Sequence, residues 1–174
     1  SIEIEKPKCN EILVRTSVSG LCHSDLHFIE GKYPTPVPAV LGHEAAGVVE
    51  AVGQDVTHVK PGDHVVTCLS VFCGHCEYCV TGNQTLCSNT AIKMPPGIAQ
   101  RLRWKGAHLN QFLNLSSFAE QMLVHENAVV KIREEMPLDL AALLGCGVLT
   151  GYGAVVHSAR LKPGTTVAIL GCGG

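Results

Sequence analysis

Four cysteines within fifteen residues form the feature that most constrains how this chain folds. They follow the pattern C-x2-C-x2-C-x7-C and are Cys73, Cys76, Cys79 and Cys87. Four thiolates complete the tetrahedral coordination of a zinc ion and leave no position open for a substrate. The spacing therefore predicts a structural zinc lobe at about residues 71–90. Two disulfides or a set of buried free thiols are the alternatives.

The composition indicates a globular chain in a reducing compartment. The 174 residues are 46% hydrophobic, and 13 Lys and Arg against 15 Asp and Glu give a net charge of -2. The sequence shows no evident basic block, signal peptide or apolar stretch of transmembrane length. Nine cysteines are an odd number, and the chain is long for a disulfide scaffold. We expect a cytoplasmic protein with neither nucleic acid nor a membrane as a partner.

Short segments rich in β-branched residues surround the cysteine cluster. They predict antiparallel strands of a small barrel or sandwich at residues 11–18, 45–52, 64–67, 118–124 and 128–132. The prolines of residues 33–38 indicate an irregular loop. Residues 88–113 show no periodicity, so we expect irregular structure there.

The pattern changes to helices near the C-terminus. We predict a helix at residues 137–144 that ends at Gly145, and a second helix at residues 150–161. A buried strand is expected at residues 166–170, followed by the start of a glycine-rich turn. A strand, a glycine turn and a helix begin a nucleotide-binding βαβ unit. We therefore expect the chain to be part of a longer polypeptide.

Three dispersed residues, Cys22, His43 and Cys146, are candidates for a second metal site. Two thiolates and an imidazole leave the fourth zinc position open, as a catalytic zinc requires. The residues are far apart in the sequence, so only the fold can bring them together. The alternatives are two ordinary buried cysteines and a histidine in a structural role.

Five motifs, taken in order, resemble those of the zinc-dependent medium-chain alcohol dehydrogenases, in particular the classical branch. They are residues 20–27, residues 42–44, the four-cysteine cluster, residues 145–153 and residues 171–174. The resemblance covers nearly the whole chain. It implies a mostly β fold with some α: an incomplete GroES-like catalytic domain over residues 1–147. Residues 148–174 would then hold the first helix and strand of a truncated Rossmann NAD-binding domain.

The resemblance also implies roles at the second metal site. Cys22, His43 and Cys146 would bind the catalytic zinc, and Glu44 would approach the metal from behind. Asp25 would hydrogen-bond the nitrogen of His43 that faces away from the metal, which fixes the tautomer.

Catalytic, cofactor and substrate roles follow from the same resemblance. Ser24 and His27 would pass the released proton to solvent. The residues implied in cofactor binding are His23, Ser24, His27, Thr150, Gly171, Gly173 and Gly174. Those implied in the substrate pocket are Ser24, Leu69 and Tyr33. Two departures from the family pattern are His23, where arginine is frequent, and Ser24, where threonine is common.

The resemblance implies hydride transfer between a small alcohol and NAD(P), giving an aldehyde or ketone. Two zinc ions per chain and NAD are the expected cofactors, and NADP stays open because the residue that selects between them lies beyond Gly174. The alternatives are an S-(hydroxymethyl)glutathione (formaldehyde) dehydrogenase and a catalytically inactive zinc-stabilised fragment. We expect the parent protein to be a homodimer or homotetramer.

Overall fold

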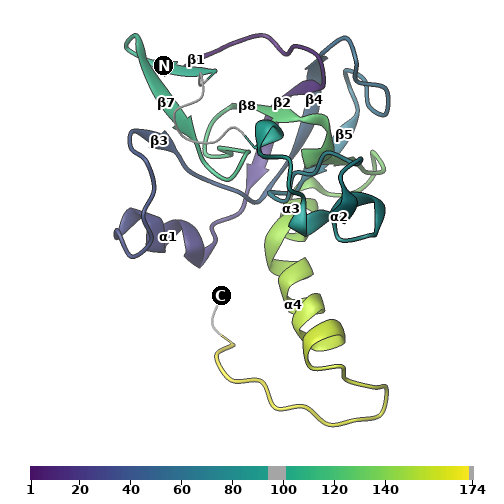
Figure 1. Ribbon diagram of the computed structural model, residues 1–174. Helices are drawn as coiled ribbons and strands as arrows, with labels where there is room; N and C mark the ends of the chain where they lie inside the picture. The colour runs from purple at the N-terminus through teal and green to yellow at the C-terminus, as the bar shows by residue number, and fades with distance from the viewer. Residues whose placement is uncertain (94–100, 173–174) are drawn as a thin grey trace.

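Two β-sheets form the body of the protein in the computed structural model, which describes residues 1–93 and 101–172 (Figure 1). The larger sheet is antiparallel with the strand order β8-β2-β4-β5-β9. Its strands are β8 (Gln121–His125), β2 (Glu11–Ser19), β4 (Ala45–Val52), β5 (His64–Thr67) and β9 (Val129–Lys131). The five strands predicted from sequence are thereby confirmed, although β8 begins three residues later than expected.

The main core lies against the larger sheet. Alternate residues of β2 show why: Ile12 and Val14 are fully buried, whereas Arg15 is exposed. Period-two alternation places one face of a strand in the core and the other in solvent. The buried cluster is completed by side chains of the other strands and the loops between them, including Ala45, Val49, Val59, Val65, Val71, Leu115 and Met122.

The smaller sheet has the strand order β1-β6-β7-β3. Its strands are β1 (Glu3–Ile4), β6 (Leu102–Trp104), β7 (Ala107–Gln111) and β3 (Ala39–Val40). The expectation of irregular structure is therefore wrong at residues 102–111, where β6 and β7 form a hairpin. Its turn residues Lys105 and Gly106 have φ of 50° and 80°, the backbone that two-residue hairpin turns need. These strands bury few side chains, so they leave little hydrophobic pattern in the sequence.

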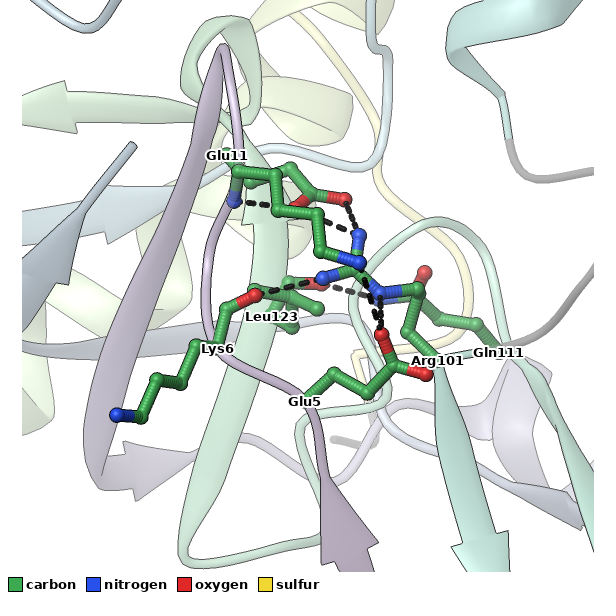
Figure 2. A network of polar contacts seen from close by, with 7 residues as sticks. Glu5, Lys6, Glu11, Arg101, Gln111 and Leu123 are labelled. Atoms are coloured by element: carbon green, nitrogen blue, oxygen red, sulfur yellow. Dashed lines mark hydrogen bonds and ion pairs between the residues drawn. The ribbon is translucent and has the colours of Figure 1, made fainter. Parts of the chain in front are cut away.

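Arg101 fastens the N-terminal segment to the two sheets (Figure 2). Its guanidinium donates to Glu5 at 2.7 Å and to both carboxylate oxygens of Glu11 at 2.7 and 2.8 Å. It also donates to the backbone carbonyl of Lys6 at 2.6 Å. The planar guanidinium carries three donor nitrogens, so it can bind the two carboxylates and the carbonyl at the same time. The network thus joins the residues before β6, the chain after β1 and the first residue of β2.

The helical segments lie outside the sheets. Helix α1 (His23–Ile29) occupies a stretch for which the sequence predicted no helix. The zinc lobe contains α2 (Glu77–Val80) and the 3-10 turn η1 (Gln84–Leu86); η2 (Thr90–Ile92) follows it, and η3 (Glu126–Ala128) links β8 to β9.

One continuous helical run, Leu138–Ser158, projects from the body of the protein (Figure 1). It comprises α3 (Leu138–Leu143), the π-helical turn η4 (Leu144–Val148), α4 (Leu149–Gly153) and the π-helical turn η5 (Ala154–Ser158). The predicted stop at Gly145 is therefore wrong. A Cβ at Gly145 would collide with the carbonyl oxygen of Thr67, so glycine here permits close packing of the helix on β5.

By length and composition, the same run of 21 residues could cross a membrane. The expectation that no apolar stretch reaches transmembrane length is therefore wrong. However, the start of the run packs on protein: Ala141 and Ala142 form a buried cluster with Ala46 of β4. A helix that packs in this way passes the same test, so the run is weak evidence for a membrane span.

Residues 166–170 do not form the expected strand. They are exposed and have no regular secondary structure. A buried parallel strand requires hydrogen-bonding neighbours on both sides and helices over its faces. None of the described strands lies beside this segment, so its apolar side chains, such as Ile169 and Leu170, are left in solvent.

Candidate metal centres

The four-cysteine lobe folds as predicted, with its sulfur atoms facing one another. The Sγ atoms of Cys73, Cys76, Cys79 and Cys87 all lie within 4.8 Å of one another. The measured separations are 3.4 Å for Cys76–Cys79, 3.9 Å for Cys76–Cys87 and 3.9 Å for Cys73–Cys79. A tetrahedron of Zn–S bonds of about 2.3 Å requires sulfur atoms about 3.8 Å apart. The four sulfurs therefore fit a zinc ion closely.

The alternatives for this cluster fit less well. All nine cysteines are free in the structure, and a disulfide requires sulfur atoms about 2.05 Å apart. Backbone N–H groups point at the sulfurs, with Cys73 donating to Cys87 at 3.3 Å and Cys76 donating to Cys73 at 3.4 Å. Such donors stabilise thiolates, which are the form that binds metal. His75 is not drawn into the cluster, because its Nδ1 contacts the carbonyl oxygen of Cys73 at 3.0 Å.

The environments of two lobe cysteines differ in their effect on protonation. Backbone N–H groups of Ser88 and Cys79 lower the pKa of Cys76 to about 5. Burial raises the pKa of Cys79 to about 11. A divalent metal bound at the cluster would favour the thiolate form of all four cysteines.

The fold also brings together the three dispersed candidates. Ligand atoms of Cys22, His43, Glu44 and Cys146 lie within 4.8 Å of one another. Cys22 is the N-cap residue of α1, and His43 and Glu44 directly precede β4. Cys146 lies in the π-helical turn η4, a type of distortion that often occurs at functional sites. Three elements far apart in the sequence thus converge on one point.

A buried carboxylate orients His43. Its Nδ1 lies 3.2 Å from Asp25 Oδ1, which also accepts the N–H of Gly42 at 3.1 Å. His43 and Asp25 are 1% and 3% exposed. Gly42 has φ of 93°, and a Cβ there would lie 2.5 Å from Ser117 Oγ. The contact with Asp25 occupies Nδ1 and leaves Nε2 of His43 to face the cluster.

The donor set of this second cluster fits a divalent metal ion. Burial, together with the neighbouring Cys22 and Glu44, raises the pKa of Cys146 to about 12. Glu44 is 5% exposed, and the backbone around it is fixed by Gly20 N–H and Ser19 Oγ, which donate to its carbonyl at 2.8 and 3.1 Å. Two thiols and a carboxyl group therefore share a poorly solvated site. A dication would compensate their ionisation, as it does in zinc centres.

Comparison with known proteins accounts for this combination of fold and clusters. Residues 8–134 match the family model of the alcohol dehydrogenase GroES-like domain. The match covers well over half of the chain. This chain belongs to the zinc-dependent alcohol dehydrogenase family.

Solved structures agree with the family assignment. An alcohol dehydrogenase zinc-binding domain protein from Burkholderia ambifaria is 42% identical, with a TM-score of 0.85 over 95% of this chain and 46% of that chain. Benzyl alcohol dehydrogenase from Acinetobacter calcoaceticus is 40% identical, with a TM-score of 0.79 over 93% of this chain and 44% of that chain. A cobalt- and zinc-bound thermostable alcohol dehydrogenase from Pyrobaculum aerophilum is 31% identical, with a TM-score of 0.72 over 93% of this chain and 44% of that chain. The chain thus spans less than half the length of these relatives.

The residues that the family resemblance implied in cofactor binding lie at exposed and half-buried positions. His23 is exposed on α1, whereas Ser24 and His27 are half-buried. Thr150 is exposed on α4, and Gly171 has φ of 80° in the exposed C-terminal segment. Gly173 and Gly174 lie outside the described residues. The described part of the chain does not unite these positions into one site.

Two of the three residues implied in the substrate pocket, Tyr33 and Leu69, lie in different surroundings. Tyr33 is 50% exposed and packs against His27, with ring centroids 5.3 Å apart. Leu69 packs against the main hydrophobic core. Two cavities, of about 260 and 400 Å³, lie elsewhere and are lined by neither residue.

Phe112 is a site residue that the sequence did not suggest. It is 4% exposed and contacts His43, with ring centroids 6.0 Å apart, and Phe28 of α1 at 4.7 Å. The ring thus packs α1 against the candidate metal ligand. It follows β7 in the segment expected to be irregular. An isolated aromatic residue there gave no sequence signal of this role.

Proposed function

We propose that this chain is the zinc-binding catalytic part of a nicotinamide-dependent alcohol dehydrogenase. The observation that carries the proposal is the convergence of Cys22, His43 and Cys146 from three separate elements. Two thiolates and one imidazole are a ligand set of catalytic zinc, whereas the four-cysteine lobe has the ligand set of structural zinc. The family match supports the assignment to an alcohol dehydrogenase.

The residues of the second cluster have distinct roles in the proposal. Cys22, His43 and Cys146 would hold the zinc, and Asp25 would keep Nε2 of His43 free of its proton through the contact at Nδ1. Glu44 would supply a further carboxylate oxygen behind the ligands. Zinc bound there would supply Lewis acidity to a substrate oxygen.

Ser24 and His27 would move the proton that an alcohol loses. They lie three residues apart on α1, so they share one side of the helix next to Cys22. Both are half-buried, which leaves each accessible from the surface. The Ser24 hydroxyl would accept the proton from the substrate alcohol as it passes its own towards His27, which would release a proton to solvent.

The parent protein would transfer hydride between an alcohol and NAD, giving an aldehyde or ketone. The other cofactor residues in this proposal are His23, Thr150, Gly171, Gly173 and Gly174, and Tyr33 and Leu69 stay proposed as substrate contacts. The 40% identity to benzyl alcohol dehydrogenase makes benzyl alcohol the first substrate to assay. We also propose a cytoplasmic homodimer or homotetramer.

The zinc content of the reduced, purified chain tests the two metal centres. The expected result is two zinc ions per chain. Cys146→Ser and Cys79→Ser should each lower this to one, because each removes a ligand from a different centre. Cys9→Ser, at an exposed position away from both centres, is the matched control and should retain two. If the Cys146→Ser variant still held two zinc ions per chain, the proposal of a second zinc centre at Cys146 would be contradicted.

Turnover by the full-length parent tests the proposed reaction. The expected result is zinc-dependent reduction of NAD with benzyl alcohol or another small primary alcohol. Cys146→Ala should abolish turnover while the structural zinc stays bound. Activity close to that of the unchanged parent would refute the role given to Cys146.

A further inference from the structure

Two histidines of α1 stand one helical turn apart on the outer side of the candidate metal centre. His23 and His27 are an i, i+4 pair, and their ring centroids are 4.7 Å apart with an angle of 73° between the planes. Residues at this spacing face one another, because four residues advance a helix by about 6 Å and just over one turn. His23 is exposed and His27 is half-buried, so both rings are open to a ligand from solvent.

His27 is held in place by its surroundings. The Tyr33 ring meets it edge-on with centroids 5.3 Å apart, and Tyr33 in turn packs on Phe28 at 5.5 Å. One imidazole of the pair is therefore positioned by the fold, whereas His23 lies exposed next to it on the helix. A ligand that is already positioned loses less conformational entropy when it binds.

The charged groups of this segment determine which kind of ion the pair can bind. Asp25 is buried and turned towards Gly42 and His43, and Glu30 pairs with Lys32 at 2.6 Å. The pair therefore offers two neutral nitrogen donors without a free carboxylate from α1 or its C-cap. Imidazole suits zinc, copper and nickel, whereas calcium and magnesium prefer oxygen ligands.

We propose that His23 and His27 form a third metal site, a surface chelate for a divalent transition-metal ion. It differs from the two cysteine centres in lacking thiolates and in being open to solvent. Two imidazoles at i, i+4 on one helical face are a known arrangement for zinc. Binding at the first imidazole makes the second an intramolecular ligand, so the pair binds a metal more tightly than either histidine alone.

Metal at this site has a consequence that rests on the proposed function. The same two side chains are the ones proposed to contact the cofactor and to release the proton. An occupied chelate would therefore inhibit the parent enzyme at a metal concentration above that needed to fill the cysteine centres. Metal binding itself can be measured on this chain whether or not the parent is a dehydrogenase.

The test is a titration of the zinc-loaded chain with Ni²⁺, followed by calorimetry, with the zinc content measured before and after. The expected result is one saturable Ni²⁺ site with no loss of zinc. His23→Gln and His27→Gln should each weaken binding about tenfold or more, because either removes the chelate. His157→Gln, at an exposed histidine outside both cysteine centres, is the matched control and should bind as the unchanged chain does.

A rescue variant separates chelation from a general effect of the substitutions. Leu26 is 42% exposed, and it lies three residues from His23 on the same side of the helix. Adding Leu26→His to His27→Gln should recover most of the lost affinity. The proposal is overturned if the unchanged chain shows no saturable Ni²⁺ site, if either single variant binds as tightly as the unchanged chain, or if the double variant stays as weak as His27→Gln. Circular dichroism and zinc content establish that each variant is folded.

Discussion

Asp25 Oδ1 lies 3.2 Å from Nδ1 of His43, and both side chains are buried. The same oxygen accepts the N–H of Gly42, so the carboxylate fixes the backbone and the ring together. Asp25 belongs to α1, as does the N-cap Cys22, whereas His43 precedes β4. This contact therefore joins two of the segments that meet at the candidate catalytic centre.

Asp25→Asn should weaken metal binding at the Cys22, His43 and Cys146 cluster. An amide cannot match the carboxylate as an acceptor for Nδ1–H, so the ring loses both its tautomer preference and its orientation. Loss of such an outer partner lowers metal affinity by about 10- to 100-fold. Competition with a chromophoric zinc chelator measures the change, and one zinc should become easier to remove.

Asp55→Asn, at an exposed aspartate, is the control for Asp25→Asn and should leave the affinities of both zincs unchanged. The four-cysteine lobe should also keep its zinc in the Asp25→Asn variant. Equal weakening of both centres would instead indicate general unfolding, and an unchanged second centre would contradict the role given to Asp25.

Gly145→Ala should destabilise the chain even though alanine favours helices more than glycine does. The added Cβ would collide with the carbonyl oxygen of Thr67, so the helical run must move away from β5. Overpacking of this kind costs about 1–3 kcal/mol. Because Cys146 is the next residue, the shift should also weaken the second metal centre. Urea unfolding and zinc content measure the two effects.

Gly151→Ala is the matched control in the same helical run. A Cβ at Gly151 meets no atom within 4 Å, so only the helix propensity changes. This variant should be as stable as the unchanged chain or more stable, by up to about 1 kcal/mol. If the two alanine variants behaved alike, the contact with Thr67 would not be the reason for glycine at position 145.

The zinc lobe could be predicted because its ligands are close in the sequence. Spacings of two residues between Cys73, Cys76 and Cys79 determine most of the geometry locally. The strands of the larger sheet could also be predicted, because their segments are rich in β-branched residues and have turn residues at their ends. The family and the GroES-like fold followed from the order of the motifs, and the comparisons confirm both.

The second metal centre depends on tertiary structure, so the local structure around its ligands could not be predicted from the sequence. The helix that begins at His23 and the π-helical turn around Cys146 leave no periodic pattern. The helical run also continues through Gly145, because packing on Thr67 outweighs the low helix propensity of glycine.

His125 should make the chain less stable in mild acid. Burial lowers its pKa below the ordinary value of 6.5, against the opposing effect of Glu126 and Glu11. Its Nδ1 accepts the N–H of Asn127 at 3.1 Å, which a protonated ring cannot do. When the pKa of a histidine is lower in the folded state, its contribution to folding stability is fully present at pH values above its unfolded pKa. That contribution to stability is lost as the pH falls from about 6.5 through the folded pKa.

His125→Asn removes this titration and keeps a side-chain acceptor for the N–H of Asn127. Urea unfolding at pH 7.5 and at pH 5 should therefore show a smaller acid-induced loss of stability in the variant than in the unchanged chain. His157→Asn, at an exposed histidine, should show the loss of the unchanged chain. If the unchanged chain and both variants lost the same stability at pH 5, His125 would not be the cause of the acid sensitivity.

Arg101→Lys should loosen the N-terminal segment from the sheets. Lysine keeps the charge, but its single ammonium nitrogen cannot reach Glu5, Glu11 and the carbonyl of Lys6 at once, whereas Nε, Nη1 and Nη2 of the guanidinium contact one of them each (Figure 2). Arg101 is only 14% exposed, so loss of some of these contacts should cost about 1 kcal/mol. Arg103→Lys, two residues along the chain and within β6, is the control and should change the urea midpoint less. Hydrogen exchange should locate the effect at residues 5–11, because the guanidinium holds that segment. Faster exchange spread evenly over the larger sheet would mean that Arg101 supports the fold as a whole rather than this attachment.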